Sequence, residues 1–160
     1  MDMKTVNVYY SYQTERKDEY RKVRQCAKDY LGLSLDLNIV RSANGKPDFE
    51  YCCHFNISHS YGLWVCAIGP DTLGIDCEKI RGGDHSRVSE HAGIASSDSS
   101  VFFKDWCRKE SYVKYTGSGL RDISKPVDES LYYTYIDIDS GYSVCLCTKE
   151  EVEVVTKCID

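Results

Sequence analysis

Hydrophobic and polar residues recur with two different periods along this chain, and the two periods predict strands mixed with helices. Apolar runs with two-residue alternation predict a strand over residues 3–10 and a hairpin over 53–69, which turns near Ser60–Gly62. Further strands are predicted at residues 74–80, 130–138, 142–148 and 151–159. Strands and helices in one chain are typical of a mixed fold, which we expect to be of the α+β class.

Helical spacing appears in two longer segments. The first begins at Thr14, which we expect to cap the helix, and ends at Gly32. The second runs from about Val101 to Tyr115 and is closed by Gly117. Residues 81–100 are rich in Ser, Gly and Asp, and we expect them to contain the junction between two halves of the chain. A short helix is also expected there, around Ser86–His91.

Composition narrows the range of functions. The chain has 160 residues, enough for one domain or two small packed halves, and a net charge of −5 argues against a protein that coats nucleic acid. The nine cysteines lack the spacing of zinc sites or secreted disulfide frameworks, which favours reduced thiols. The first residues lack the apolar stretch of a signal peptide, and no apolar run is long enough for a membrane span. We therefore expect a cytoplasmic protein with no membrane partner.

Carboxylates supply the candidate chemistry. In the predicted strand Gly74–Ile80, Asp76 and Glu78 lie two residues apart and share a face, where they repel each other unless a positive group lies between them. Glu110 and Lys114 are one turn apart on the second helix. Three carboxylates would suit Mg²⁺ bound together with a phosphate group. An ordinary Glu–Lys pair on a solvated helix is the alternative.

Four short motifs occur in an order that resembles the 4′-phosphopantetheinyl transferase family. They are a G-K-P turn, an I-S-H-S strand, a G-I-D-x-E strand and a W-x-x-K-E-S-x-x-K helix followed by G-x-G, at Gly45–Pro47, Ile57–Ser60, Gly74–Glu78 and Trp106–Lys114 with Gly117–Gly119. The resemblance covers residues 44–125 best. More than seventy residues precede Gly74, a feature that resembles the two-half, surfactin synthetase-activating type.

This resemblance implies a fold of two related α/β halves in one chain, residues 1–80 and 81–160, with the active-site cleft between them and a monomer as the assembly. It implies transfer of the 4′-phosphopantetheine arm of coenzyme A to a serine of an acidic acyl, peptidyl or aryl carrier protein, with release of 3′,5′-ADP. Coenzyme A would be the co-substrate and Mg²⁺ the cofactor.

The resemblance also implies the roles of individual residues. The Mg²⁺ ligands would be Asp76, Glu78 and Glu110. Glu110, or a metal-bound water that it contacts, would be the base for the serine hydroxyl, with Asp76 and Lys114 as the other catalytic residues. The predicted coenzyme A contacts are Lys46, Ser58, His59, Lys109 and Lys114.

The chain also departs from the family pattern. It is shorter than usual for the two-half type, and the basic stripe Lys17, Arg21, Arg24 and Lys28 would have to replace a longer basic segment. Basic residues that could steer an acidic carrier protein are Arg108, Lys109, Arg121 and Lys125. The alternative function is a non-catalytic protein that binds coenzyme A or a nucleotide on the same fold; the retained acidic residues and Lys114 argue against it.

Overall fold

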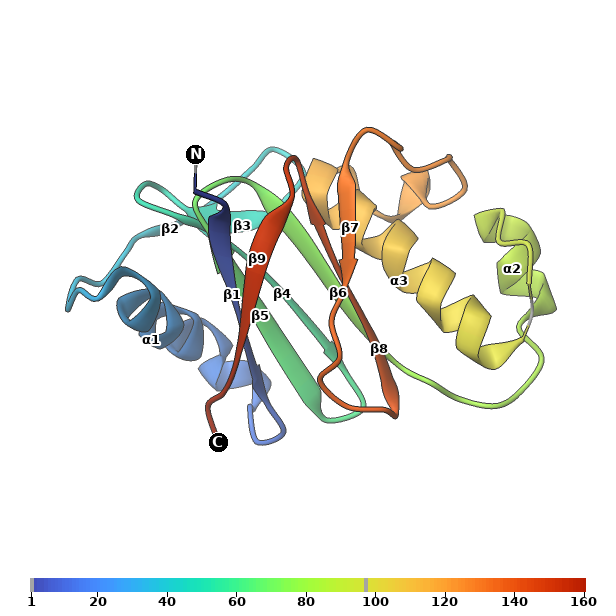
Figure 1. The fold of residues 1–160 in the computed structure, drawn as a ribbon, viewed down its shortest axis with the longest axis horizontal. Helices are drawn as coiled ribbons and strands as arrows, with labels where there is room; N and C mark the ends of the chain where they lie inside the picture. The colour runs from blue at the N-terminus through green and yellow to red at the C-terminus, as the bar shows by residue number, and fades with distance from the viewer. Residues whose placement is uncertain (1, 97) are drawn as a thin grey trace.

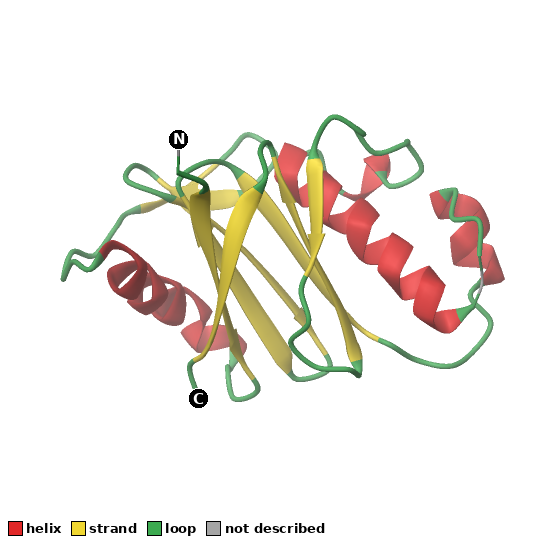
Figure 2. Ribbon diagram, viewed as in Figure 1, coloured by secondary structure: helices red, strands yellow, loops and turns green. Residues whose placement is uncertain are grey.

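The computed structural model describes residues 2–96 and 98–160, so Ser97 of the predicted junction lies outside the described residues. Strands and helices are interleaved, which confirms a mixed α/β fold (Figure 2). In chain order the elements are β1 (Lys4–Ser11), η1 (Arg16–Asp18), α1 (Glu19–Leu31), β2 (Ile39–Arg41), β3 (Pro47–Phe49), β4 (His54–Ser60), β5 (Leu63–Gly69), β6 (Leu73–Lys79), α2 (Ser86–Ala92), α3 (Ser99–Thr116), η2 (Leu120–Asp122), β7 (Tyr132–Tyr135), β8 (Tyr142–Thr148) and β9 (Val152–Cys158).

The first sheet has the strand order β4-β5-β1-β9, and β9 runs parallel to β1 while the other pairs are antiparallel. One face of this sheet packs against α1, which lies at the left of the molecule in Figure 1. Tyr9, Val23, Phe55 and Ile68 are buried in that layer. Burial of each large apolar side chain contributes roughly 1.5–3 kcal/mol, so this layer secures α1 to the sheet.

The second sheet has the antiparallel order β6-β8-β7. Its inner face packs against the first sheet, where Val8, Ile75 and Leu146 are buried together. α3 packs on its other face, at the right of the molecule in Figure 1. A Cβ atom on Gly74 would lie 2.2 Å from the carbonyl oxygen of Ser111 and 2.4 Å from the backbone nitrogen of Tyr115, so glycine allows α3 to approach β6 closely.

Side chains of β4 connect the two sheets, although β4 and β6 are not paired as strands. Alternate residues of β4 accept hydrogen bonds from alternate backbone N–H groups of β6: Asn56 from Ile75 (2.9 Å), Ser58 from Cys77 (3.2 Å) and Ser60 from Lys79 (3.0 Å). We call these three bonds the β4–β6 clamp. The clamp satisfies buried N–H groups along β6, and it aligns β6 with β4 residue by residue.

Both long helices end as predicted, but their starts differ from the prediction. Gly32 and Gly117 end α1 and α3 in the left-handed conformation, with φ of 64° and 73°. The prediction that Thr14 caps the first helix was wrong: α1 begins at Glu19, and the Thr14 hydroxyl instead accepts a hydrogen bond from Lys22. α3 begins at Ser99, two residues before the predicted start, because the Asp98 side chain accepts a bond from the N–H of Val101.

The strands cross the predicted boundary between halves. β9, near the C-terminus, completes the sheet that contains β1, and β6, which precedes residue 80, pairs with β8. The division into residues 1–80 and 81–160, and the two-half arrangement built on it, stay predictions. Among the helices of the described residues, none is both long and apolar enough to cross a membrane.

Candidate active site

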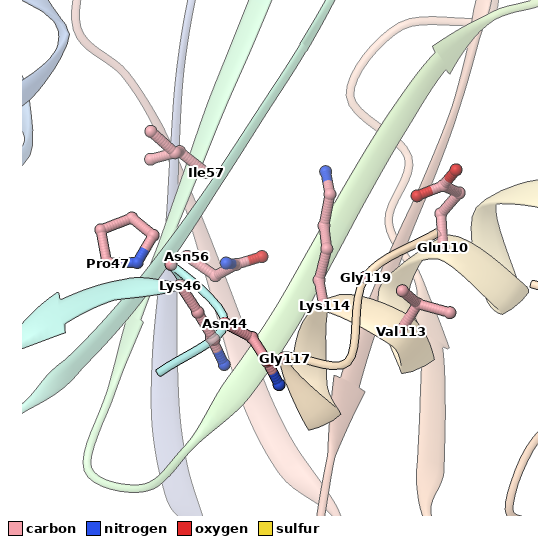
Figure 3. Close-up of a pocket in the computed structure, with 11 residues that line it drawn as sticks. Asn44, Lys46, Pro47, Asn56, Ile57, Glu110, Val113, Lys114, Gly117 and Gly119 are labelled. Atoms are coloured by element: carbon pink, nitrogen blue, oxygen red, sulfur yellow. The ribbon is translucent and has the colours of Figure 1, made fainter. Parts of the chain in front are cut away.

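A cavity of about 430 Å³ lies where the turn before β3, strand β4 and helix α3 meet (Figure 3). Lys46 comes from the turn, Asn56 from β4, and Glu110 and Lys114 from successive turns of α3. Gly117 and Gly119 close the cavity at the C-terminal end of α3. Three of the predicted site residues therefore share one cavity.

Asp76 lies beside this cavity on β6 and is 3% exposed. Asp76 Oδ1 accepts hydrogen bonds from Lys114 Nζ at 3.0 Å and from Ser58 Oγ at 3.1 Å. Among the described residues, the other oxygen, Oδ2, is buried without a hydrogen-bond partner. A buried carboxylate oxygen without a donor is costly, and such an atom in a native protein points to an ion, a water molecule or a functional role.

Glu78 and Glu110 experience the charge of Asp76. Burial, followed by repulsion from Asp76, raises the pKa of Glu78 to about 6. The same two causes raise the pKa of Glu110 to about 7, although Lys114 opposes them. The face of β6 that meets α3 carries Gly74, Asp76 and Glu78. The opposite face carries Ile75 and Cys77, which are buried against the first sheet, as the two-residue period predicted.

The chemistry of these carboxylates fits a hard divalent cation such as Mg²⁺, which prefers oxygen ligands. Asp76 has a buried oxygen without a hydrogen-bond partner among the described residues, and a cation would relieve the repulsion of Asp76 on Glu78 and Glu110. Within residues 2–96 and 98–160, no three His, Cys, Asp or Glu side chains are grouped tightly enough to hold a metal ion as they stand. The side chains of the two glutamates would therefore have to turn toward Asp76 to complete the ligand set.

Lys114 is the cation that already faces Asp76. Burial alone would lower the pKa of Lys114, but the charge of Asp76 and its hydrogen bond outweigh burial and raise the pKa. The ammonium group therefore stays charged at neutral pH. Figure 3 shows Lys114 and Glu110 leaving the same side of α3, as residues four apart on a helix do.

Lys46 and Ser58 have structural contacts that the sequence did not reveal. Lys46 Nζ donates to the carbonyl oxygens of Leu73 (3.0 Å) and Tyr115 (3.4 Å), so it joins the start of β6 to the end of α3. Burial lowers its pKa. The Ser58 hydroxyl belongs to the β4–β6 clamp and contacts Asp76.

His59 and Lys109 do not line the cavity that contains Lys114. His59 is exposed, on the opposite face of β4 from Ser58, and lines a separate pocket of about 160 Å³ with Arg16 and Trp64. Lys109 Nζ donates to the carbonyl oxygens of Ile123 (3.4 Å) and Lys125 (3.1 Å), which secures the segment after α3.

Two of the other basic residues that were expected to steer a carrier protein, Arg108 and Lys125, also have local partners. Arg108 contacts Glu129 at 2.6 Å, and Lys125 contacts Asp122 at 2.7 Å. Their charges are therefore partly neutralised at the surface where a carrier protein was expected to be steered.

Asn56 and Ser60 are the residues that the sequence interpretation missed. Asn56 lines the cavity and, with Ser60, forms the outer parts of the clamp. The available signal was the alternation of Asn56, Ser58 and Ser60 with apolar or aromatic residues: polar side chains on one face of a strand indicate that this face meets hydrogen-bonding groups rather than an apolar core.

Comparison with known proteins gives a consistent family assignment. The sequence model described as the 4′-phosphopantetheinyl transferase superfamily matches residues 72–154. The 4′-phosphopantetheinyl transferase gsp of Aneurinibacillus migulanus is 36% identical over 121 residues, which cover 65% of this chain and 51% of that protein. The chain thus spans about half the length of this relative.

Two further relatives match over more of their length. The 4′-phosphopantetheinyl transferase Sfp of Bacillus subtilis (strain 168) is 31% identical over 152 residues, 76% of this chain and 67% of that protein. The 4′-phosphopantetheinyl transferase psf-1 of Bacillus pumilus is 29% identical, with 84% of this chain and 72% of that protein covered. With its Asp76–Lys114 pair, its neighbouring glutamates and these matches, the chain belongs to the 4′-phosphopantetheinyl transferase superfamily, and to the branch that resembles Sfp.

Proposed function

We propose that this protein transfers the 4′-phosphopantetheine arm of coenzyme A to a serine of an acyl, peptidyl or aryl carrier protein and releases 3′,5′-ADP. Family membership and the names of the relatives support this reaction. The single observation that carries the proposal is the buried Oδ2 of Asp76, which has no hydrogen-bond partner among the described residues and neighbours two glutamates with raised pKa values.

Asp76, Glu78 and Glu110 would hold Mg²⁺ in this proposal. When bound, the ion would neutralise negative charge on the pyrophosphate of coenzyme A. Asp76 provides the free oxygen, and its partner Lys114 provides a fixed positive charge next to the same site. Lys114 would stabilise the charge that builds up on the departing 3′,5′-ADP.

The reaction exchanges one phosphorus–oxygen bond for another. The serine Oγ of the carrier protein forms a bond to the phosphorus atom that bears the pantetheine arm, and the bond from that phosphorus to the oxygen of 3′,5′-ADP breaks. The serine must lose its proton. Glu110, or a metal-bound water that it contacts, is the proposed acceptor of this proton, because Glu110 lines the cavity beside Lys114 and a carboxylate can act as a general base.

Coenzyme A contacts are proposed at both faces of β4. Lys46 and Lys114 line the larger cavity and would face the phosphates. His59 lies beside the smaller pocket, together with Arg16, and would meet a part of coenzyme A that extends over that face. The side chain of Lys109 is already bonded to backbone carbonyls, so its contact with coenzyme A stays a prediction.

The test is to incubate the protein with coenzyme A, Mg²⁺ and a panel of apo carrier proteins, and then to weigh each carrier protein by mass spectrometry. We expect at least one carrier to gain the mass of the arm. Glu110→Gln should abolish this gain, whereas Glu129→Gln, which changes an exposed acid outside the cavity, should not. Binding of coenzyme A without a gain on any carrier would support the non-catalytic binding protein instead.

A further inference from the structure

The β4–β6 clamp contains one member that differs from the other two. Asn56 and Ser60 each bond to a backbone N–H of β6. Ser58 accepts the same kind of bond from the N–H of Cys77, but its hydroxyl also contacts the carboxylate of Asp76. The clamp and the candidate active site therefore meet at a single side chain, which is 6% exposed.

The direction of both hydrogen bonds of Ser58 follows from its chemistry. The N–H of Cys77 can only donate, so the Ser58 oxygen accepts that bond. The single proton of the hydroxyl is then free to point at Asp76 Oδ1, 3.1 Å away. Because Cys77 adjoins Asp76 in β6, the backbone that carries the carboxylate and the carboxylate itself are both bound to one oxygen atom.

The two oxygens of Asp76 are consequently unequal. Oδ1 receives two donors, Ser58 Oγ and Lys114 Nζ, while Oδ2 has no partner among the described residues. Two donors on one oxygen hold the carboxylate against rotation, because exchange of Oδ1 and Oδ2 would break both bonds. A carboxylate that binds a metal ion is commonly oriented by such hydrogen bonds from neighbouring groups.

We propose that Ser58 is a positioning residue, which orients the Asp76 carboxylate so that Oδ2 remains free for the divalent cation; this inference rests on the proposed function. The single proton of that buried hydroxyl is already directed at Asp76, so in this arrangement Ser58 has no proton to donate to a phosphate, and its contact with coenzyme A stays a prediction. Ser58 acts through Asp76 and does not touch the reacting atoms.

The clamp offers a matched control for the test. Ser58→Ala removes the bond to the N–H of Cys77 and the bond to Asp76, whereas Ser60→Ala removes only the equivalent bond to the N–H of Lys79. Both serines are buried on the same face of β4, at 6% and 8% exposure. A purely structural role of Ser58 would make the two variants alike, apart from a difference in stability.

The measurement is binding of Mn²⁺ alone, followed by the electron paramagnetic resonance signal of the free ion, with a thermal melt of each variant. We expect Ser58→Ala to weaken Mn²⁺ binding about tenfold and Ser60→Ala to leave it unchanged. If Ser58→Ala does not fold, Ser58→Cys replaces it, since a thiol keeps the volume but donates only a weak hydrogen bond.

Two results would overturn the inference while the proposed function stands: wild-type affinity in the Ser58 variant, or an equal loss of affinity in both variants. If the wild-type protein transfers the arm only with Mg²⁺ and binds Mn²⁺, the proposed function is supported independently of either variant. If the wild-type protein binds no Mn²⁺, both the metal site and the positioning role of Ser58 fail together.

Discussion

The charged surface of α1 and the buried face between β6 and α3 handle charge in opposite ways. Around α1 each basic residue of the predicted stripe has a local partner: Lys17 with Glu15, Arg21 with Asp18, Lys28 with Asp36, and Arg24 with the carbonyl oxygen of Leu37. Between β6 and α3, the buried Asp76 and Glu110 and the half-buried Glu78 lie near Lys114, and both glutamates have raised pKa values.

This difference separates a structural from a functional use of charge. Exposed pairs such as those around α1 contribute about 0–1 kcal/mol each to stability. An excess of buried negative charge costs stability, and it persists where a ligand of opposite charge compensates it. That the basic stripe replaces a coenzyme A-binding segment stays a prediction, whereas the β6–α3 face has a buried carboxylate oxygen without a hydrogen-bond partner among the described residues.

The largest effect is expected when a carboxylate is removed from the β6–α3 face, compared with removal of a carboxylate that pairs with α1. Asp76→Asn should lower the rate of the proposed arm transfer by about 1,000-fold, because it removes a proposed metal ligand and the charged partner of Lys114. Asp36→Asn, which breaks the surface pair with Lys28, should leave the rate unchanged. Single-turnover assays by mass spectrometry provide the measurement, and a similar loss in both variants would contradict the comparison.

The second prediction concerns the close approach of α3 to β6, which brings Glu110 near Asp76 and Glu78. Gly74→Ala places a methyl group 2.2 Å from the carbonyl of Ser111 and should lower the free energy of unfolding by about 3 kcal/mol. Gly82→Ala is the control, because a Cβ there meets no atom within 4 Å. Urea unfolding compares the two, and an equally stable Gly74→Ala protein would show that α3 shifts freely.

The pH dependence of stability measures the excess negative charge directly. An acid whose pKa is higher in the folded state binds its proton more tightly there, so its stabilising effect is present below about pH 4.5 and is lost as the pH rises through 6 to 7. Without metal, the protein should lose on the order of 2 kcal/mol from this source between pH 4.5 and 8.

Urea unfolding in a chelating buffer across that pH range checks the expectation. Glu110→Gln removes one of the two acids and should flatten the profile. Addition of Mg²⁺ should stabilise the wild-type protein more at pH 8 than at pH 5, because the acids must be ionised to bind it. Equal profiles for the wild type and Glu110→Gln would show that Glu110 carries no excess charge.

The smallest effect is expected on the α1 side. Lys28→Ala removes one half of the ion pair with Asp36 and should change the free energy of unfolding by less than about 0.5 kcal/mol, with no effect on the affinity for coenzyme A. Isothermal titration calorimetry with coenzyme A and Mg²⁺ provides the second readout. A clear loss of affinity would show that α1 binds the ligand despite its paired charges.

Local patterns in the sequence were sufficient to predict which face of β6 the acids occupy and where the two long helices end. The two-residue period placed Asp76 and Glu78 on one face of β6, and Gly32 and Gly117 ended their helices as expected, because strand alternation and the left-handed cap depend only on neighbouring residues. The spacing of Glu110 and Lys114 likewise placed them on successive turns of one helix.

Only the tertiary structure decided which partner each of these residues meets. The pairing of β9 with β1 joins the two ends of the chain, and Lys109 donates to the carbonyl groups of Ile123 and Lys125, which lie beyond the end of its own helix. The clearest example is Ser58, whose hydroxyl is bound by Cys77 and directed at Asp76. Sequence periodicity tells which face of a strand a side chain occupies, but the hydrogen-bonding groups opposite that face are set by how the two sheets pack.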